Sequence, residues 1–111
     1  MNDSDLIIVL SRKKAEMNKT LVLAKERGFA LAEAERGYKI AKAKFIAKAR
    51  MDKVPVTLIR DLAQGEVDIS KLRLERDKAK VLYLNAIEAI NIYKLECRLI
   101  EAQVNREWGH A

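Results

Sequence analysis

The chain has 111 residues, a formal net charge of +6, and 50% hydrophobic and 34% charged residues. That mixture is too apolar for a disordered chain and too charged for a membrane span. Four glycines and one proline supply too few turns for an all-β or α/β fold, whereas abundant Ala, Leu, Lys and Glu are typical of long helices and coiled coils. We therefore predict one all-α domain that spans residues 1–111.

The first predicted helix runs from about residue 5 to residue 52. Every seventh residue along it is apolar, in the row Leu10, Met17, Ala24, Leu31, Tyr38 and Phe45. The alternate row is mixed, because it contains Lys14, Gly28 and Lys42. Gly28 and Gly37 each weaken a helix by roughly 1 kcal/mol relative to alanine, so a kink or break between them stays open.

Residues 53–68 form the predicted connection, which contains a short helix. Pro55 restricts Val54 to extended conformations and so ends the first helix. Thr57 is the expected N-cap of the short helix, and Gly65 is its expected end. The stretch from Thr57 to Gly65 also resembles a helix-turn-helix fragment, but the helix after it is too long for a recognition helix.

A second long helix is predicted over about 69–108, with Asp68 or Ser70 as its N-cap. Its seam, spaced by three and four residues, is apolar at ten of twelve positions, which favours a coiled coil. The seam positions are Ile69, Leu72, Arg76, Ala79, Tyr83, Ala86, Ile90, Tyr93, Cys97, Ile100, Val104 and Glu107.

Two long helices joined by about fifteen residues should form a long antiparallel hairpin. In the predicted register Gly28 lies opposite Tyr93, where the missing side chain makes room for the ring, and Tyr38 lies opposite Tyr83. A shift by one heptad would place Gly28 opposite Ala86 and leave a gap, so we expect the first register.

The second helix carries further large apolar residues outside its seam. A two-helix hairpin buries one stripe of each helix, so these residues predict self-association, most simply a dimer that forms a helical bundle. The alternative is that the short helix folds back and covers part of this surface. The predicted oligomer interface consists of Leu74, Val81, Leu84, Ile92, Leu95 and Leu99.

The positive charge is concentrated in the middle of the chain. Residues 36–80 have a balance of +7, whereas residues 1–35 are balanced and residues 81–111 have −1. A basic hairpin end suits phosphate backbones or an acidic protein partner, although solvation alone also explains a charged helical face. The predicted contact residues are Arg36, Lys39, Lys42, Lys44, Lys48, Arg50, Lys53, Arg73, Lys78 and Lys80.

No enzyme motif is present, so we predict no catalytic residue, metal site, cofactor or small-molecule substrate. Cys97 falls on the apolar seam and reads as a buried structural thiol. Arg76 is expected to stack on the ring of Phe45. Trp108 is expected to close the neutral end of the hairpin, and His110 reads as a residue of a frayed end.

Four segments in the C-terminal half carry a resemblance to a known group of proteins. They are Thr57 to Gly65, Leu74-Glu75-Arg76-Asp77, Ala86-Ile87-Glu88-Ala89-Ile90-Asn91 and Arg106-Glu107-Trp108. These segments resemble small uncharacterised helical proteins of phages and prophages of Gram-positive bacteria. The resemblance implies a phage or prophage origin and action in the cytoplasm of the bacterial host, with no functional residue to carry over.

Together these observations predict a non-enzymatic accessory protein that binds nucleic acid through its basic end. Two alternatives stay open. One is a protein-interaction or inhibitory module that acts on a host or phage protein, and the other is a structural component of a virion.

Overall fold

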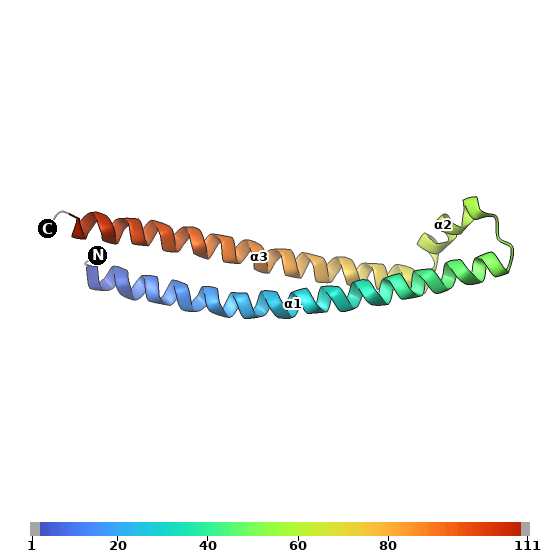
Figure 1. The fold of residues 1–111 in the computed structure, drawn as a ribbon, viewed down its shortest axis with the longest axis horizontal. Helices are drawn as coiled ribbons and strands as arrows, with labels where there is room; N and C mark the ends of the chain where they lie inside the picture. Colours follow the sequence, from blue (N-terminus) through green and yellow to red (C-terminus); the bar gives the residue numbers. More distant parts are fainter. Residues whose placement is uncertain (1–2, 110–111) are drawn as a thin grey trace. The chain divides into compact units, whose positions relative to one another are not determined.

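A computed structural model describes residues 3–109 of the chain as three helices (Figure 1). They are α1 (Asp3–Met51), α2 (Val56–Gly65) and α3 (Val67–Trp108), and the described residues contain no strand. The all-α helical hairpin is confirmed, and the predicted bounds of both long helices are correct to within two residues. No helix in the described range is both long and apolar enough to cross a membrane.

α1 is a single helix that continues through Gly28 and Gly37, so the break that the sequence left open does not occur. The row from Leu10 to Phe45 is confirmed as the inward face, because each of its six residues is buried or half-buried. In the alternate row, Lys14 and Leu21 are exposed.

The end of α1 is closed by backbone hydrogen bonds around a left-handed residue. The N–H of Val54 donates to the carbonyl of Ala49 at 3.0 Å, and the N–H of Lys53 donates to that of Arg50 at 3.1 Å. This is the Schellman arrangement, in which the residue after the cap adopts positive φ. Here that residue is Lys53, with φ 61°, instead of the usual glycine.

Two predicted caps are wrong. α2 begins at Val56 after an N-cap at Pro55 with no side-chain hydrogen bond, so Thr57 lies inside the helix. Gly65 is its last residue, as predicted. The N–H of Ile69 donates to Glu66 Oε2 at 2.7 Å, and the carboxylate of Glu66 thereby caps α3.

Neither Asp68 nor Ser70 caps α3, because the helix begins at Val67 and both residues lie inside it. The prediction for α3 considered only short polar side chains as N-caps. The longer Glu66, just outside the helix, reaches the same backbone donor.

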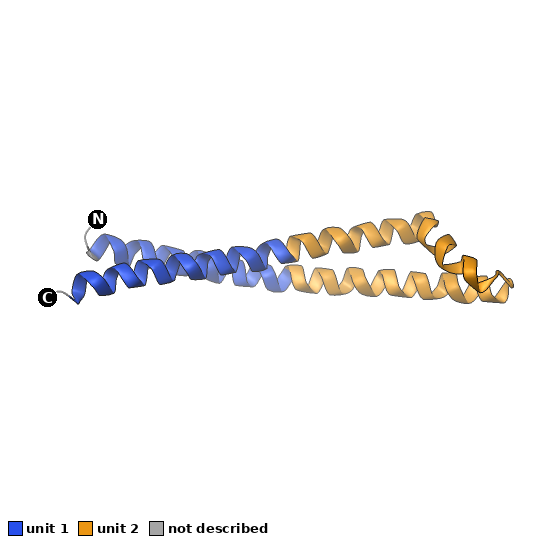
Figure 2. Cartoon of the chain, turned by 90° about the horizontal axis from the view of Figure 1, so that it is seen from above, with its two compact units in different colours: residues 1–26, 84–111 blue, residues 27–83 orange. Residues whose placement is uncertain are grey.

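The chain forms two compact units (Figure 2). Unit 1 comprises residues 1–26 and 84–111, of which 3–26 and 84–109 are described. Unit 2 comprises residues 27–83 and therefore contains α2.

In unit 1 the two helices run antiparallel around a core of Ala24, Ala86 and Ile90, with Met17 and Ile87 packed against it. Cys97 is buried, as expected for a structural thiol. Trp108 is 57% exposed and so does not cover this end, contrary to the prediction. His110 lies outside the described residues.

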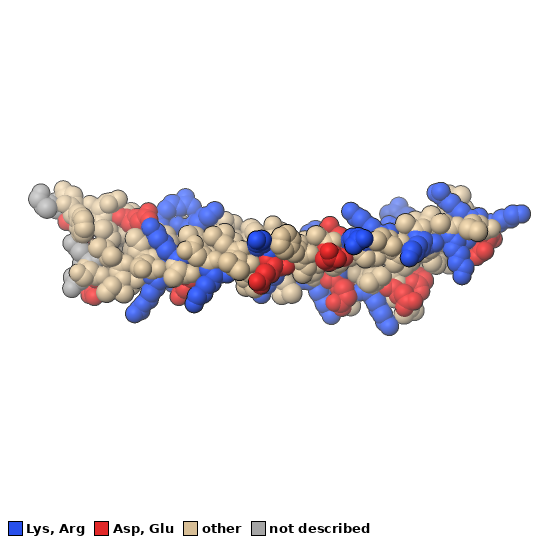
Figure 3. Space-filling model, turned by 60° about the horizontal axis from the view of Figure 1, so that its bottom comes forward, with Lys and Arg blue, Asp and Glu red and all other residues tan. Residues whose placement is uncertain are grey.

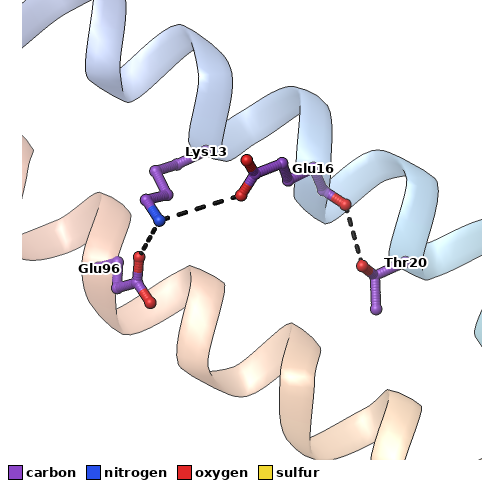
Figure 4. A network of polar contacts seen from close by, with 4 residues as sticks. All are labelled: Lys13, Glu16, Thr20 and Glu96. Atoms are coloured by element: carbon purple, nitrogen blue, oxygen red, sulfur yellow. Dashed lines mark hydrogen bonds and ion pairs between the residues drawn. The ribbon is translucent and has the colours of Figure 1, made fainter.

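Ion pairs join the two helices of unit 1. Lys13 Nζ lies 2.8 Å from Glu96 Oε2 across the helices and 3.9 Å from Glu16 Oε2 on its own helix (Figure 4). The hydrogen bond to Glu96 raises the pKa of Lys13 above its ordinary value of 10.5. Lys14 Nζ of α1 lies 3.3 Å from Glu101 Oε1 of α3, so this pair also crosses between the helices. These pairs cross between the helices at the edge of the apolar core.

In unit 2, α2 packs into the seam between the two long helices. Its Ala63 is 1% exposed and forms a buried cluster with Tyr38 of α1 and Ile69 of α3. Half-buried Phe45 and Leu72 pack against this cluster. The short helix therefore folds back over α1. It does not cover the apolar surface that α3 carries outside its seam, whose six predicted interface residues all stay exposed, so the alternative to self-association that the sequence left open is wrong.

The predicted register of the hairpin is wrong. A Cβ atom on Gly28 would lie 3.3 Å from Tyr83 Cε2, whereas the prediction placed Tyr93 opposite Gly28. Tyr38 accordingly meets Arg76 and not Tyr83. The reason is α2: because it occupies the seam of the last turns of α1, α3 begins beside Tyr38 and not beside the end of α1.

Candidate nucleic-acid interface

The whole excess of positive charge lies in unit 2. Residues 27–83 contain 14 basic and 8 acidic residues, a balance of +6, while the rest of the chain has 8 of each. Figure 3 shows Lys and Arg side chains projecting from the end of unit 2 that carries α2 and the last turns of α1. All ten predicted contact residues belong to this unit.

One side of α1 presents a stripe of cations: Arg36, Lys39, Lys42 and Arg50. At about 100° per residue these four lie within about a third of the helix circumference. None of them has a carboxylate partner within 4.0 Å among the described residues. Lys42 is half-buried, and its ammonium lies 5.8 Å from the centroid of the Tyr38 ring. The stripe therefore carries charge that no ion pair neutralises.

α2 adds a further cation to this stripe. Arg60 faces Lys42 and Arg50 across a shallow groove between α1 and α2, whose apolar lining is Ile46, Val56 and Ile59. The sequence analysis did not include Arg60. The signal was available in principle, because a short helix that folds back with Ile59 and Ala63 inward leaves Arg60 beside α1.

Lys48 belongs to a different groove. It lines the other side of the α1–α2 contact together with two acidic residues, Asp52 and Glu66. Lys44 is exposed on that same side of α1. Lys53 lies in the turn after α1. Lys44 and Lys48 thus lie outside the stripe, as helical spacing predicts. The same spacing assigned Lys53 to the stripe, and this is wrong, because α1 ends at Met51.

The three predicted contact residues of α3 have other surroundings. Arg73 is half-buried, and its Nη2 donates to the carbonyl of Gln64 at 2.9 Å, which ties α3 to the end of α2. Lys78 Nζ lies 3.8 Å from Glu75 Oε1. Lys80 is exposed. Arg73 therefore has a structural contact that the sequence did not predict.

Arg76 stacks on an aromatic ring, as expected, but the ring is that of Tyr38 and not of Phe45. Its Cζ lies 4.5 Å from the ring centroid, and its guanidinium bonds Asp77 Oδ1 at 2.9 Å. The hydrogen bond to Asp77 raises the pKa of Arg76 above its ordinary value. The cation thus stays charged while it covers the buried ring.

The outward face of α3 is apolar in both units. In unit 2, a shallow groove is lined by Leu74, Val81 and Leu82 with Asp77 and Lys78. In unit 1, the exposed residues are Leu84, Ile92, Leu95 and Leu99. All six predicted interface residues are between 49% and 61% exposed.

The described residues contain no cluster of three or more His, Cys, Asp or Glu side chains that could hold a metal ion. Cys97 is 6% exposed, so its thiol is withdrawn from solvent. No protein-family model, curated protein or solved structure matches the chain.

Proposed function

We propose that this chain is a non-enzymatic, phage-type accessory protein of the bacterial cytoplasm that binds nucleic acid. The binding face is the α1–α2 face of unit 2, defined by Arg36, Lys39, Lys42, Arg50 and Arg60. The observation that supports the proposal is the convergence of these five cations, none of which has a carboxylate partner within 4.0 Å in the described part of the chain.

The expected mode of recognition is contact with phosphates. Lysine and arginine side chains neutralise phosphates and release counterions, which gives affinity without sequence preference. The ring of Tyr38, which lies beside Lys42 of the stripe, is 9% exposed and covered by Arg76, so it is not available to stack on a base. We therefore expect binding that depends strongly on salt and weakly on sequence.

Charge reversal within the stripe tests the proposal. Arg36, Lys39 and Arg50 are exposed and make no ion pair, so replacing all three by Glu should leave the helices intact. We expect the variant to lose at least about tenfold in affinity for duplex DNA, and its salt slope to flatten by about one unit per lost phosphate contact. Fluorescence anisotropy with labelled DNA and RNA at several salt concentrations measures both quantities.

A matched control reverses three cations of unit 1 that are also exposed and unpaired: Arg12, Lys19 and Lys94. Both triple variants have the same net charge. If nucleic acid binding is absent, or if the two variants weaken it equally, the α1–α2 face is not the binding site.

The second candidate is a module that binds another protein. It is favoured by the apolar groove of Leu74, Val81 and Leu82 on α3, which the cation stripe does not explain. A salt-independent interaction that is lost on replacing Val81 by Glu, with no affinity for DNA or RNA, would favour this function.

A further inference from the structure

Within unit 1, α3 carries a second seam, on the side turned away from α1. Its positions are spaced by four and three residues in alternation, the coiled-coil pattern, and we call this row the outer seam. All of its members are exposed, and the three large ones, Ile92, Leu95 and Leu99, are 49%, 54% and 61% exposed. The outer seam consists of Glu88, Ile92, Leu95, Leu99, Ala102 and Arg106.

The outer seam has opposite charges at its two ends. Glu88 and Arg106 flank four apolar residues, and neither forms an ion pair in the described part of the chain. They are eighteen positions apart on one helix, about 27 Å, so they cannot pair within one chain. A second copy of α3 that runs in the opposite direction would place its Arg106 beside Glu88 and its Glu88 beside Arg106.

We infer that the outer seam of unit 1 is the interface of a homodimer, in which α3 pairs antiparallel with α3 of a second copy. About the two-fold axis, Leu95 packs on Leu99 of the second copy, and Ile92 packs on Ala102. Glu88 of each chain then pairs with Arg106 of the other. Each contact occurs twice, which is the requirement for a closed two-fold interface.

Other pairings of the same seam are less favourable. A parallel dimer in register sets Glu88 against Glu88 and Arg106 against Arg106, so like charges meet at both ends. An antiparallel dimer shifted by one heptad sets Glu88 against Leu99, which desolvates a carboxylate without a partner. The charged ends thus select both direction and register.

The sequence analysis predicted self-association, and this interface adds the direction and the register of the two helices. It includes Ile92, Leu95 and Leu99 of the six residues predicted from the sequence. Leu74 and Val81 belong to unit 2, and Leu84 lies in unit 1 before the outer seam begins, so these three are not part of the interface. The inference does not rest on nucleic-acid binding, because its residues belong to unit 1 and the cation stripe to unit 2.

Charge exchange in the full-length chain tests the inference by sedimentation equilibrium at micromolar concentrations. Glu88→Arg and Arg106→Glu should each weaken the dimer by at least about tenfold, because like charges then meet twice. The double variant restores opposite charges and should return to within about threefold of the parent. A matched control, Lys94→Glu, changes an exposed charge of α3 outside the outer seam and should have no effect.

A further variant, Leu99→Glu, should give a monomer of unchanged helicity, because Leu99 is exposed within one chain. This variant tests the interface even if the charge variants fail to fold. A parent chain that is monomeric, a dimer that survives Leu99→Glu, or a double variant no tighter than the singles would each overturn the inference.

Discussion

Gly28 and Gly37 lie on the same helix, but a methyl group added to each would meet different surroundings. At Gly37 no heavy atom lies within 4 Å of the added Cβ, whereas at Gly28 the Cβ would lie 3.3 Å from Tyr83 Cε2 and 3.6 Å from Cδ2. Both glycines lower the stability of α1 through backbone entropy. Only Gly28 offsets this loss of stability, because its missing side chain lets the ring of Tyr83 approach the helix.

Replacing Gly37 by Ala should therefore raise the free energy of unfolding by roughly 0.5–1 kcal/mol. Replacing Gly28 by Ala should raise it less or lower it, because Tyr83 must shift by a few tenths of an ångström to accept the methyl group. Urea denaturation followed by circular dichroism measures both changes. An equal gain from the two substitutions would show that Tyr83 moves at no cost.

At the level of the helix, the end of α1 depends on a residue poorly suited to its conformation. Lys53 has φ 61°, in the left-handed region where a side chain costs roughly 1–2 kcal/mol and glycine costs little. The helix accepts that cost because the hydrogen bonds from Val54 and Lys53 close its last turn. This closing turn directs the chain toward α2.

Lys53→Gly should stabilise the chain by roughly 0.5–1 kcal/mol, since the relief of strain exceeds the added entropy of the unfolded state. Lys53→Ala removes the same charge but keeps the side-chain strain, so it should leave the stability nearly unchanged. Thermal unfolding of the two variants separates conformation from charge. A stabilisation by Ala equal to that by Gly would mean that charge repulsion, not φ, limits this turn.

The sequence predicted the helices and their inward faces, because heptad spacing is a property of each helix alone. It did not predict which residues of the two faces meet. Gly28 offered a plausible place for a ring of α3, and the choice of Tyr93 over Ala86 as its neighbour assumed that the connection only turns the chain. Ala63 shows why the assumption failed, since its helix enters the seam and displaces the start of α3.

The position of α2 also explains which residues of the candidate site could be predicted from the sequence. Helical geometry grouped five cations on one side of the first helix, namely Arg36, Lys39, Lys42, Arg50 and Lys53. The first four lie together on α1, but Lys53 lies in the turn after the helix. Arg60 and Lys48 depend on where α2 packs. No spacing rule in the sequence gives the position of a short helix, because a few apolar contacts such as that of Ile59 decide it.

At the scale of the whole chain, the two units differ in how far apart their contacting residues lie in the sequence. In unit 2, Tyr38 contacts Ala63 and Ile69, which follow within about thirty residues. In unit 1, Lys13 pairs with Glu96 and Lys14 with Glu101, more than eighty residues later. Because longer loops have a higher closure entropy, we expect unit 2 to form first.

A matched pair of substitutions tests this order, since Ala63 and Ala24 are both buried in helices and α2 and α1 each lose stability on replacement by Gly. Ala63→Gly should mainly slow folding, whereas Ala24→Gly should mainly speed unfolding. Stopped-flow kinetics in urea, at concentrations where the rates do not depend on protein concentration, measure both. A faster unfolding rate for Ala63→Gly with unchanged folding would reverse the proposed order.

The division of unit 1 between two distant segments also matters while the chain is being made. Residues 3–26 leave the ribosome well before their partners, residues 84–109. Since domains form as their segments emerge, the apolar row of α1 from Leu10 to Ala24 stays without its partner until residues 84–109 have been synthesised. During that interval its apolar side chains lack the contacts that bury them in the folded chain, and such exposed surface favours aggregation and chaperone binding.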